Sequence, residues 1–246
     1  MTQRKAAIVL AAGKGKRMKS DLPKVLHEIN GRPMIRLLLD TLIPIGFDHL
    51  VIVVGHKADL VRKALSDYPV TFVLQELQHG TGHAVSMARE ELAGFEGTTL
   101  VAAGDVPFLS RNSVERLFEV HQRTKAAATC LSAVFDDPAG YGRVIRRAGT
   151  DLMEAIVEHK DASPEVLAIK EINTGTFCFD NRLMFDAISQ IGRDNSQKEY
   201  YLTDTVKILH GKGFSVAVVL ATNPDEVRGI NSVDQLQYLA EKFAAR

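Results

Sequence analysis

Short apolar runs recur along the first hundred residues, and each is bounded by glycine or polar residues. Runs of this length, rich in valine, leucine and isoleucine, are typical of buried β-strands. The pattern therefore predicts four strands in this part of the chain, over residues 6–12, 50–55, 70–75 and 98–104.

Between and after these runs, apolar residues repeat at helical spacing. The pattern predicts helices over 33–45, 57–66, 82–92 and 110–124, the first of which opens on Pro33. Strand and helix thus alternate, which favours an α/β fold: a mixed, mainly parallel, Rossmann-like sheet with helices on both faces. In such a fold, ligands gather at the carboxyl ends of the strands.

The pattern loosens after residue 124. Residues 126–135 and 144–162 read as hairpin-like strands around a glycine-rich turn at 136–143. Further strands are predicted over 170–180 and 214–220, and further helices over 181–191, over 203–210 and from Ser232 onward. We expect residues 1–246 to form one domain, with a smaller lobe beginning after about residue 135.

Composition excludes several classes of protein. Thirty lysines and arginines balance thirty aspartates and glutamates, so the chain lacks the basic footprint of a nucleic-acid binder. Cys130 and Cys178 are too few for a disulfide framework, and the first residues reach glycine before an apolar signal core develops. No apolar run approaches the roughly 20 residues of a membrane span. We therefore expect a cytoplasmic protein with no membrane partner.

The first predicted strand runs straight into a glycine-rich loop, residues 13–18, with the sequence GKGKRM. Its exposed amides and three basic side chains could hold phosphate, although a plain turn with solvated lysines is the alternative. Met18 stands where a dinucleotide-binding fingerprint requires glycine, and the spacing of a Walker A loop is also missing. The two best-known phosphate motifs are therefore disfavoured.

Lys24 follows this loop and stands directly after Pro23, which fixes the backbone in front of it. Alone, this lysine would be interpreted as a solvated surface charge. Together, however, LAAGKGKRMKSDLPKVL (10–26) closely resembles the signature of the sugar-phosphate nucleotidyltransferases, in which GxGxRM is followed by PK.

Further matches to this family follow in the same order along the chain. They are QELQHGTGHA (75–84), GDVPFL (104–109), GYGRV (140–144), IVEHKDA (156–162), EINTG (171–175), EYYLTD (199–204) and GINS (229–232). Over its whole length the chain resembles the uridylyltransferase, or pyrophosphorylase, domain of the bifunctional bacterial GlmU family. The resemblance implies a nucleotide-diphospho-sugar transferase fold, with a nucleotide-binding part over about 1–135 and a sugar-binding part with a C-terminal helix over about 136–246.

The resemblance also implies the substrates UTP and N-acetylglucosamine 1-phosphate and the product UDP-N-acetylglucosamine, a peptidoglycan precursor of the cell wall. The implied nucleotide contacts are Leu10, Ala11, Ala12, Gly13, Gln75, Gly80, Thr81, Ala103 and Gly104. The implied sugar contacts are Gly142, Glu158, Asn173 and Thr203. A carboxamide such as that of Gln75 offers a donor and an acceptor side by side, which suits the edge of a uracil.

By the same resemblance, Asp105 and Asn231 hold a Mg²⁺ ion, and Arg17 and Lys24 are the catalytic cations. Two protein oxygens suffice for magnesium, since it also takes water and substrate phosphate oxygens. Each has an alternative, because an Asp after a strand or an Asn before a helix is commonly a capping residue. His56, His79, His83 and His159 lack zinc-like spacing, and we assign them no catalytic role.

We expect an in-line attack by the sugar phosphate on the α-phosphorus of UTP, without a general base. Ala103 departs from the aromatic residue that commonly precedes GD in the family, and this leaves base and sugar specificity open. No hexapeptide repeats of a left-handed β-helix follow, so acetyl transfer is not predicted, and the oligomeric state is open. The alternatives are a nucleotidyltransferase of other specificity, a non-catalytic sugar-nucleotide regulator and, disfavoured by Met18, a nicotinamide dehydrogenase.

Overall fold

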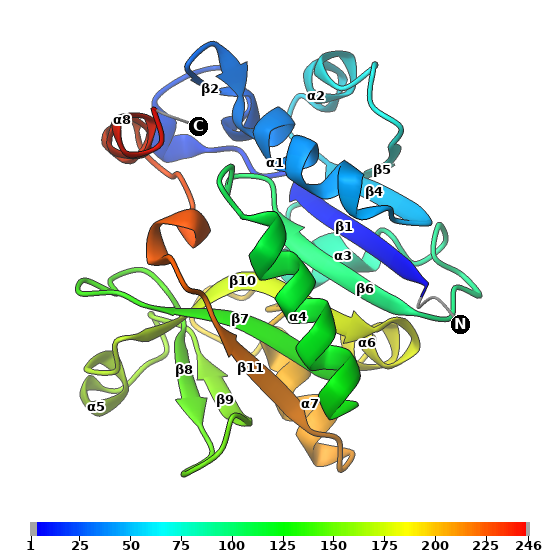
Figure 1. The fold of residues 1–246 in the computed structure, drawn as a ribbon, viewed down its shortest axis with the longest axis vertical. Helices are drawn as coiled ribbons and strands as arrows, with labels where there is room; N and C mark the ends of the chain where they lie inside the picture. Colours follow the sequence, from blue (N-terminus) through cyan, green and yellow to red (C-terminus); the bar gives the residue numbers. More distant parts are fainter. Residues whose placement is uncertain (1–3, 245–246) are drawn as a thin grey trace.

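The computed structural model describes residues 4–244, apart from the side chain of Lys16. Within these residues, nine strands form one sheet (Figure 1). Seven of them lie side by side in the order β11 (Val216–Leu220), β7 (Ala128–Val134), β10 (Glu171–Asp180), β6 (Thr98–Ala103), β1 (Lys5–Ala11), β4 (His49–Val54) and β5 (Thr71–Leu74). The hairpin of β8 (Arg143–Arg146) and β9 (Met153–Val157) extends from β10.

The sheet is mixed but mainly parallel along its central path, as predicted. Strands β6, β1, β4 and β5 run parallel to one another, and β11 is parallel to β7. Strand β10 is antiparallel to both β6 and β7, between which it lies. The carboxyl ends of β1, β4, β5 and β6 therefore meet at one edge of the sheet, where all of the predicted nucleotide contacts fall.

Helices cover both faces of the sheet, because neighbouring residues of each central strand point to opposite sides. Ala7 and Val9 of β1 pack against α1 (Met34–Leu42), α2 (Ala58–Ala64) and α4 (Arg111–Thr124). Ile8 packs on the other side against α3 (Thr81–Ser86), α6 (Asn181–Ile188) and α7 (Asp204–Gly211). Within residues 4–244, no helix has the length and apolar character needed to cross a membrane.

A third, smaller hydrophobic cluster joins α8 (Val233–Lys242) to the start of the chain. Leu239 of α8 and Phe243 pack against Met18, Ile29 and Met34. The ring of Phe243 stacks on that of Phe108, with centroids 4.1 Å apart. Figure 1 shows α8, in red, beside the blue segment that follows β1. Two regions far apart in the sequence are thus fixed to each other by apolar packing.

Some predicted boundaries are wrong. The helix expected over 82–92 ends at Ser86, where the Ser86 hydroxyl donates to the carbonyl of His83 at 2.7 Å. Beyond it the backbone continues as turns with bonds such as Arg89 N–H to Ser86 C=O. This side-chain bond competes with the helical ladder, although Ala88 and Leu92 remain buried as the pattern requires.

Several short elements were not predicted. They are a hairpin of β2 (Glu28–Ile29) and β3 (Arg32–Pro33), the helix α5 (Pro164–Leu167), and the 3₁₀ turns η1 (Lys16–Met18), η2 (Lys24–Leu26) and η4 (Pro224–Val227). The end of the helix expected over 33–45 is the 3₁₀ turn η3 (Ile43–Ile45). The β2–β3 turn places Asn30 and Gly31 at positive φ, the usual chemistry of a two-residue hairpin turn. Pro33 is the last residue of β3 and directly precedes Met34, the first residue of α1.

The two expected parts of the domain share one sheet. Strands β10 and β11 follow residue 135 in sequence but return to the central sheet, where β10 separates β6 from β7. The β8–β9 hairpin and α5 project from the sheet at one end of the molecule (Figure 1). The segment after residue 135 therefore supplies both a projecting lobe and two strands of the main sheet.

Candidate functional site

The glycine-rich loop is shaped by its contact with Lys24. Gly15 has a φ of +60°, and a Cβ there would lie 2.6 Å from the Cβ of Lys24. Only glycine combines this backbone conformation with so close an approach. Three residues on, the Met18 N–H donates to the Gly15 carbonyl at 2.9 Å, and the Met18 side chain is buried in the α8 cluster. The residue that breaks the dinucleotide fingerprint is thus a hydrophobic anchor for the loop.

The ammonium of Lys24 lies between the two residues predicted to bind metal. It donates to the carboxylate of Asp105 and, at 3.0 Å, to Oδ1 of Asn231. These partners are 81 and 207 residues away along the chain. The side chains of Lys24 and Asp105 are only 18% and 15% exposed, so the ion pair is shielded from most of the solvent.

Asn231 is not the capping residue of α8, which was the alternative interpretation of its sequence position. The residue that caps α8 is Ser232, whose hydroxyl accepts from the Gln235 N–H at 3.3 Å. Asn231 instead directs Oδ1 to Lys24, while its backbone N–H donates to Oε1 of Gln235 at 2.7 Å. The Ile230 N–H donates to the Asp105 carbonyl at 2.9 Å, and this ties the segment to the end of β6.

The chemistry of this pair of oxygen donors fits a hard divalent cation. A carboxylate and an amide oxygen converge on one positive charge, here the Lys24 ammonium, and such oxygens are the ligands that Mg²⁺ prefers. Among residues 4–244 there is no group of three or more His, Cys, Asp or Glu side chains arranged to hold a metal ion. A cation held at Asp105 and Asn231 would take its remaining ligands from water and substrate.

A cavity of about 280 Å³ opens beside Lys24, at the carboxyl ends of β1, β5 and β6. The predicted residues that line it are Leu10, Ala11, Ala12, Gly13, Lys24, Gln75, Gly80, Thr81, Ala103 and Asp105. Gly104 lies against the cavity wall, since its N–H donates to the Leu10 carbonyl at 2.9 Å. Gln78 and Glu199 also line the cavity but were not predicted, although both lie inside motifs that matched the family.

Gln75 and Gly80 are held together at one side of this cavity. Gln75 is 2% exposed, and its Nε2 donates to the Gly80 carbonyl at 3.2 Å. Gly80 has a φ of +112°, and a Cβ there would lie 2.6 Å from the Tyr200 carbonyl oxygen. The glycine therefore allows the turn before α3 to pack against the segment that carries Glu199 and Tyr200.

The predicted sugar contacts form a second group. Thr203 donates to Oε1 of Glu158 at 2.9 Å, and a Cβ at Gly142 would lie 3.3 Å from Oε2. The Asn173 N–H donates to the Gly142 carbonyl at 2.8 Å. Burial raises the pKa of Glu158, the Thr203 hydrogen bond lowers it, and nearby carboxylates raise it further. Glu158 is therefore not the solvated strand charge that its sequence alone would suggest.

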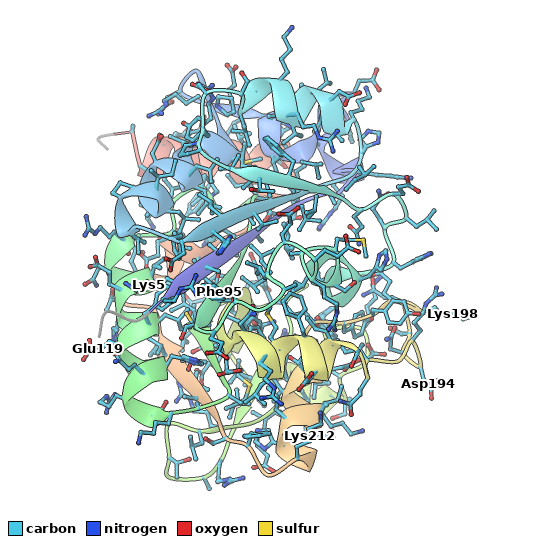
Figure 2. The ribbon with its side chains drawn as sticks, turned by 90° about the vertical axis from the view of Figure 1, so that its right-hand side faces the viewer. Lys5, Phe95, Glu119, Asp194, Lys198 and Lys212 are labelled. Carbon is cyan, nitrogen blue, oxygen red and sulfur yellow. The ribbon has the colours of Figure 1, made fainter. Side chains whose placement is uncertain are left out.

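The two groups are joined by residues 199–203. Glu199 lines the cavity, the Leu202 N–H donates to the Thr81 hydroxyl at 3.0 Å, and Thr203 reaches Glu158. The loop before this segment lies at the edge of the molecule, where Figure 2 shows Asp194 and Lys198 at its outer side. One short segment thus contacts both the predicted nucleotide residues and the predicted sugar residues.

Arg17, the second predicted catalytic cation, is exposed in the η1 turn. Burial raises the pKa of Tyr141, and the charges of Asp105 and Arg17 shift that pKa up and down respectively. The charges of Arg17 and Asp105 therefore both act on Tyr141.

Comparison with known proteins shows which chains this one is similar to. Residues 7–176 match the MobA-like NTP transferase domain. The bifunctional protein GlmU of Halalkalibacterium halodurans is 45% identical over 225 residues, which are 92% of this chain and 49% of that protein. GlmU of Clostridium botulinum is 44% identical over 237 residues, 96% of this chain and 51% of that protein. GlmU of Bacillus cereus is 47% identical over 225 residues, again 92% and 49%.

These relatives confirm the resemblance to GlmU, and the chain spans about half the length of the curated relatives that it matches. The fold also matches a crystal structure of a UDP-glucose pyrophosphorylase complexed with UDP-glucose. That match has a TM-score of 0.76 at 17% identity and covers 98% of both chains. Since the MobA-like domain covers most of the sheet, the chain belongs to the family of MobA-like NTP transferase domains.

Proposed function

We propose that this protein transfers UMP from UTP to N-acetylglucosamine 1-phosphate, giving UDP-N-acetylglucosamine and pyrophosphate. The observation that carries the proposal is the convergence of Lys24, Asp105 and Asn231 at the mouth of the cavity behind the glycine-rich loop. One cation and two oxygen donors beside this cavity support a binding site for the phosphates of a nucleotide that lies along residues 10–13.

The nucleotide would lie in the cavity with its base toward Gln75 and Gly80. Residues 10–13 are the carboxyl end of β1 and the two residues after it, and ligands of such sheets bind beyond the carboxyl ends of the strands. Ala103 leaves this wall of the cavity without an aromatic side chain. The selectivity for the base must therefore come from polar groups such as the Gln75 carboxamide.

Asp105 and Asn231 would hold a divalent cation, which we propose to be Mg²⁺. When bound, it would neutralise charge on the nucleotide phosphates. Lys24 would then leave these two oxygens for the phosphate groups, because its four-carbon stem is flexible and its ammonium is not fixed by a planar fork. Asp105 and Asn231 thus have the same task in both states, which is to hold one positive charge at this edge of the sheet.

The reaction forms one bond and breaks one bond at the α-phosphorus of UTP. An oxygen of the sugar phosphate attacks in line, and the bond from the α-phosphorus to the bridging oxygen breaks, so that pyrophosphate leaves with its electron pair. The attacking phosphate is already ionised, and no general base is needed. Lys24 and Arg17 stabilise the negative charge that develops around the α-phosphate and the leaving group.

The sugar would be oriented by Glu158, Thr203, Asn173 and Gly142. Glu158 and Thr203 are already hydrogen-bonded to each other, so they offer fixed polar groups to the hydroxyl and acetamido groups of a sugar. An analogue that lacks one of these groups would leave a buried polar atom unpaired.

Cys130 and Cys178 are free and buried, which supports our proposal of a reducing, cytoplasmic location.

The test is pyrophosphate release from UTP and N-acetylglucosamine 1-phosphate with Mg²⁺. We expect turnover that stops with EDTA and falls sharply when CTP replaces UTP or when glucose 1-phosphate replaces the acetamido sugar. Turnover with a different pair of substrates would correct the specificity but keep the mechanism. Tight binding of a sugar nucleotide without release from any pair would identify a regulator and overturn the proposal.

A further inference from the structure

His83 is held against the side chain that faces the base. Its Nδ1 lies 3.0 Å from Nε2 of Gln75, and the same Nε2 also donates to the Gly80 carbonyl at 3.2 Å. A carbonyl oxygen can only accept, so the contact with Gly80 establishes which end of the carboxamide is the nitrogen. His83 Nδ1 must therefore be the unprotonated nitrogen that accepts the second N–H of Gln75.

The imidazole is kept in this neutral form by its surroundings. Burial, and then the neighbouring His79, lower the pKa of His83, while the Leu77 carbonyl raises it. The ring lies next to His79 and Tyr200, with centroid separations of 5.4 and 6.2 Å. His83 thus presents a fixed acceptor to Gln75 at neutral pH.

Both N–H groups of the Gln75 carboxamide are consumed inside the protein. What remains is Oε1, which has no hydrogen-bond partner among residues 4–244, on a side chain that lines the cavity. An oxygen of this kind accepts only. It suits the N3–H of uracil or thymine and opposes the bare N3 of cytosine, which is itself an acceptor.

We propose that His83 is a positioning residue that sets base selectivity by locking the Gln75 carboxamide with its oxygen toward the base. Without the acceptor at position 83, the carboxamide can turn and offer its N–H groups to cytosine. This inference rests on the proposed function, in which the base lies against Gln75. His83 itself contacts neither the reacting atoms nor the phosphates in this arrangement.

The test compares binding of UTP and CTP at pH 8 by calorimetry with Mg²⁺, which needs no turnover. His83→Phe keeps a ring but removes the acceptor, and we expect the preference for UTP to fall by about tenfold, the value of one well-made hydrogen bond. His83→Asn returns an acceptor oxygen near the position of Nδ1 and should restore the preference. His79→Phe, which removes the neighbouring imidazole that does not contact Gln75, is the matched control and should leave the preference unchanged.

A double-mutant cycle shows whether His83 acts through Gln75. With Gln75→Met in place, adding His83→Phe should cause no further loss of preference. The inference is overturned if His83→Phe alone keeps the wild-type preference, if it lowers the preference equally beside Gln75→Met, or if the wild type does not prefer UTP. Pyrophosphate release is measured separately on the wild type, so a protein that prefers UTP without turnover would refute the proposed function and leave this inference standing.

Discussion

Lys24 has two tasks at the scale of single residues. In the structure its ammonium neutralises Asp105 and is also bound by Asn231, whereas the proposed reaction needs the same ammonium on the phosphates. In the proposed site, a divalent cation would have to displace this ammonium before it could bind the two oxygens. On that proposal the lysine both competes with the metal and contributes to catalysis, and the two effects can be separated by measurement.

Replacement of Lys24 by Met should move the two effects in opposite directions. We expect kcat to fall by about 10²–10³, the usual loss on removal of one charged donor from a transition state. The affinity for Mn²⁺ without nucleotide, measured by electron paramagnetic resonance, should rise on the order of three- to tenfold, because a partly buried ion pair no longer competes. Lys63→Met, at an exposed position of α2 away from the site, is the control. Weaker Mn²⁺ binding by Lys24→Met would contradict this view of the resting site.

The sequence offered candidate residues for the site, but their contacts could not be predicted from it. GKGKRM followed by PK indicated an anion-binding loop and a catalytic lysine; Gly13 of that loop and Lys24 line the cavity, and their roles stay predictions. That Lys24 bonds to Asp105 and Asn231 depends on the packing of α8 against the start of the chain, which no local spacing encodes. The contact of His83 with Gln75 depends in the same way on a turn at Gly80 whose geometry is set by Tyr200.

At the scale of elements, α8 packs beside the segment that carries Asn231, one of the two predicted metal ligands. Leu239 is 1% exposed and packs in the same cluster as Met18 and Ile230. Ile230 in turn donates to the Asp105 carbonyl, one residue before Asn231. The position of Asn231 thus depends on the apolar contacts that Ile230 and Leu239 make in this cluster.

Leu239→Ala should therefore weaken both the fold and the site. We expect the free energy of unfolding to fall by about 2–4 kcal/mol, as for other buried leucines, in urea titrations. The Mg²⁺ concentration needed for half-maximal turnover should rise as well, because Asn231 is less well held. Val233→Ala, on the same helix with 45% of the side chain exposed, should change stability by no more than about 0.5 kcal/mol. An unaltered metal requirement in Leu239→Ala would show that α8 does not position Asn231.

The hydrophobic pattern predicted whether a segment is a helix or a strand better than it predicted the residues at which each element ends. The helix after Gly80 stopped early because the Ser86 hydroxyl binds a backbone carbonyl, and such a bond depends on a rotamer rather than on periodicity. The β2–β3 hairpin was missed even though Asn30–Gly31 is a recognisable turn sequence. Its strands are only two residues long, too short to show any alternation.

At the scale of the whole molecule, the burial of Glu158 links stability to pH. Because the folded protein raises the pKa of this carboxyl above its unfolded value, the folded state binds the proton more tightly. Its contribution to stability is therefore complete below the unfolded pKa and is lost as the pH rises through the folded pKa. Asp204, whose pKa burial also raises, acts in the same direction.

Glu158→Gln removes this dependence while keeping an oxygen for the Thr203 hydroxyl. We expect the stability of this variant relative to the wild type to increase from pH 4.5 to pH 7.5, as measured by urea unfolding at a series of pH values. Glu154→Gln, at an exposed position of β9, is the control for the loss of one carboxylate. A constant difference between Glu158→Gln and the wild type across this range would mean that Glu158 is not the group responsible.

The position of β10 in the sheet also determines when the sheet can be completed during synthesis of the chain. Residues 171–180 form β10, which lies between β6 and β7, and both of these strands are made earlier. When the nascent chain has left the ribosome only as far as β7, the strand that pairs with both β6 and β7 is therefore still missing. Open strand edges of this kind pair readily with other chains. The nascent chain is therefore most exposed to misassembly between the emergence of β6 and that of β10. The two oxygens predicted to hold the metal, on Asp105 and Asn231, are both present only after residue 231 has been made.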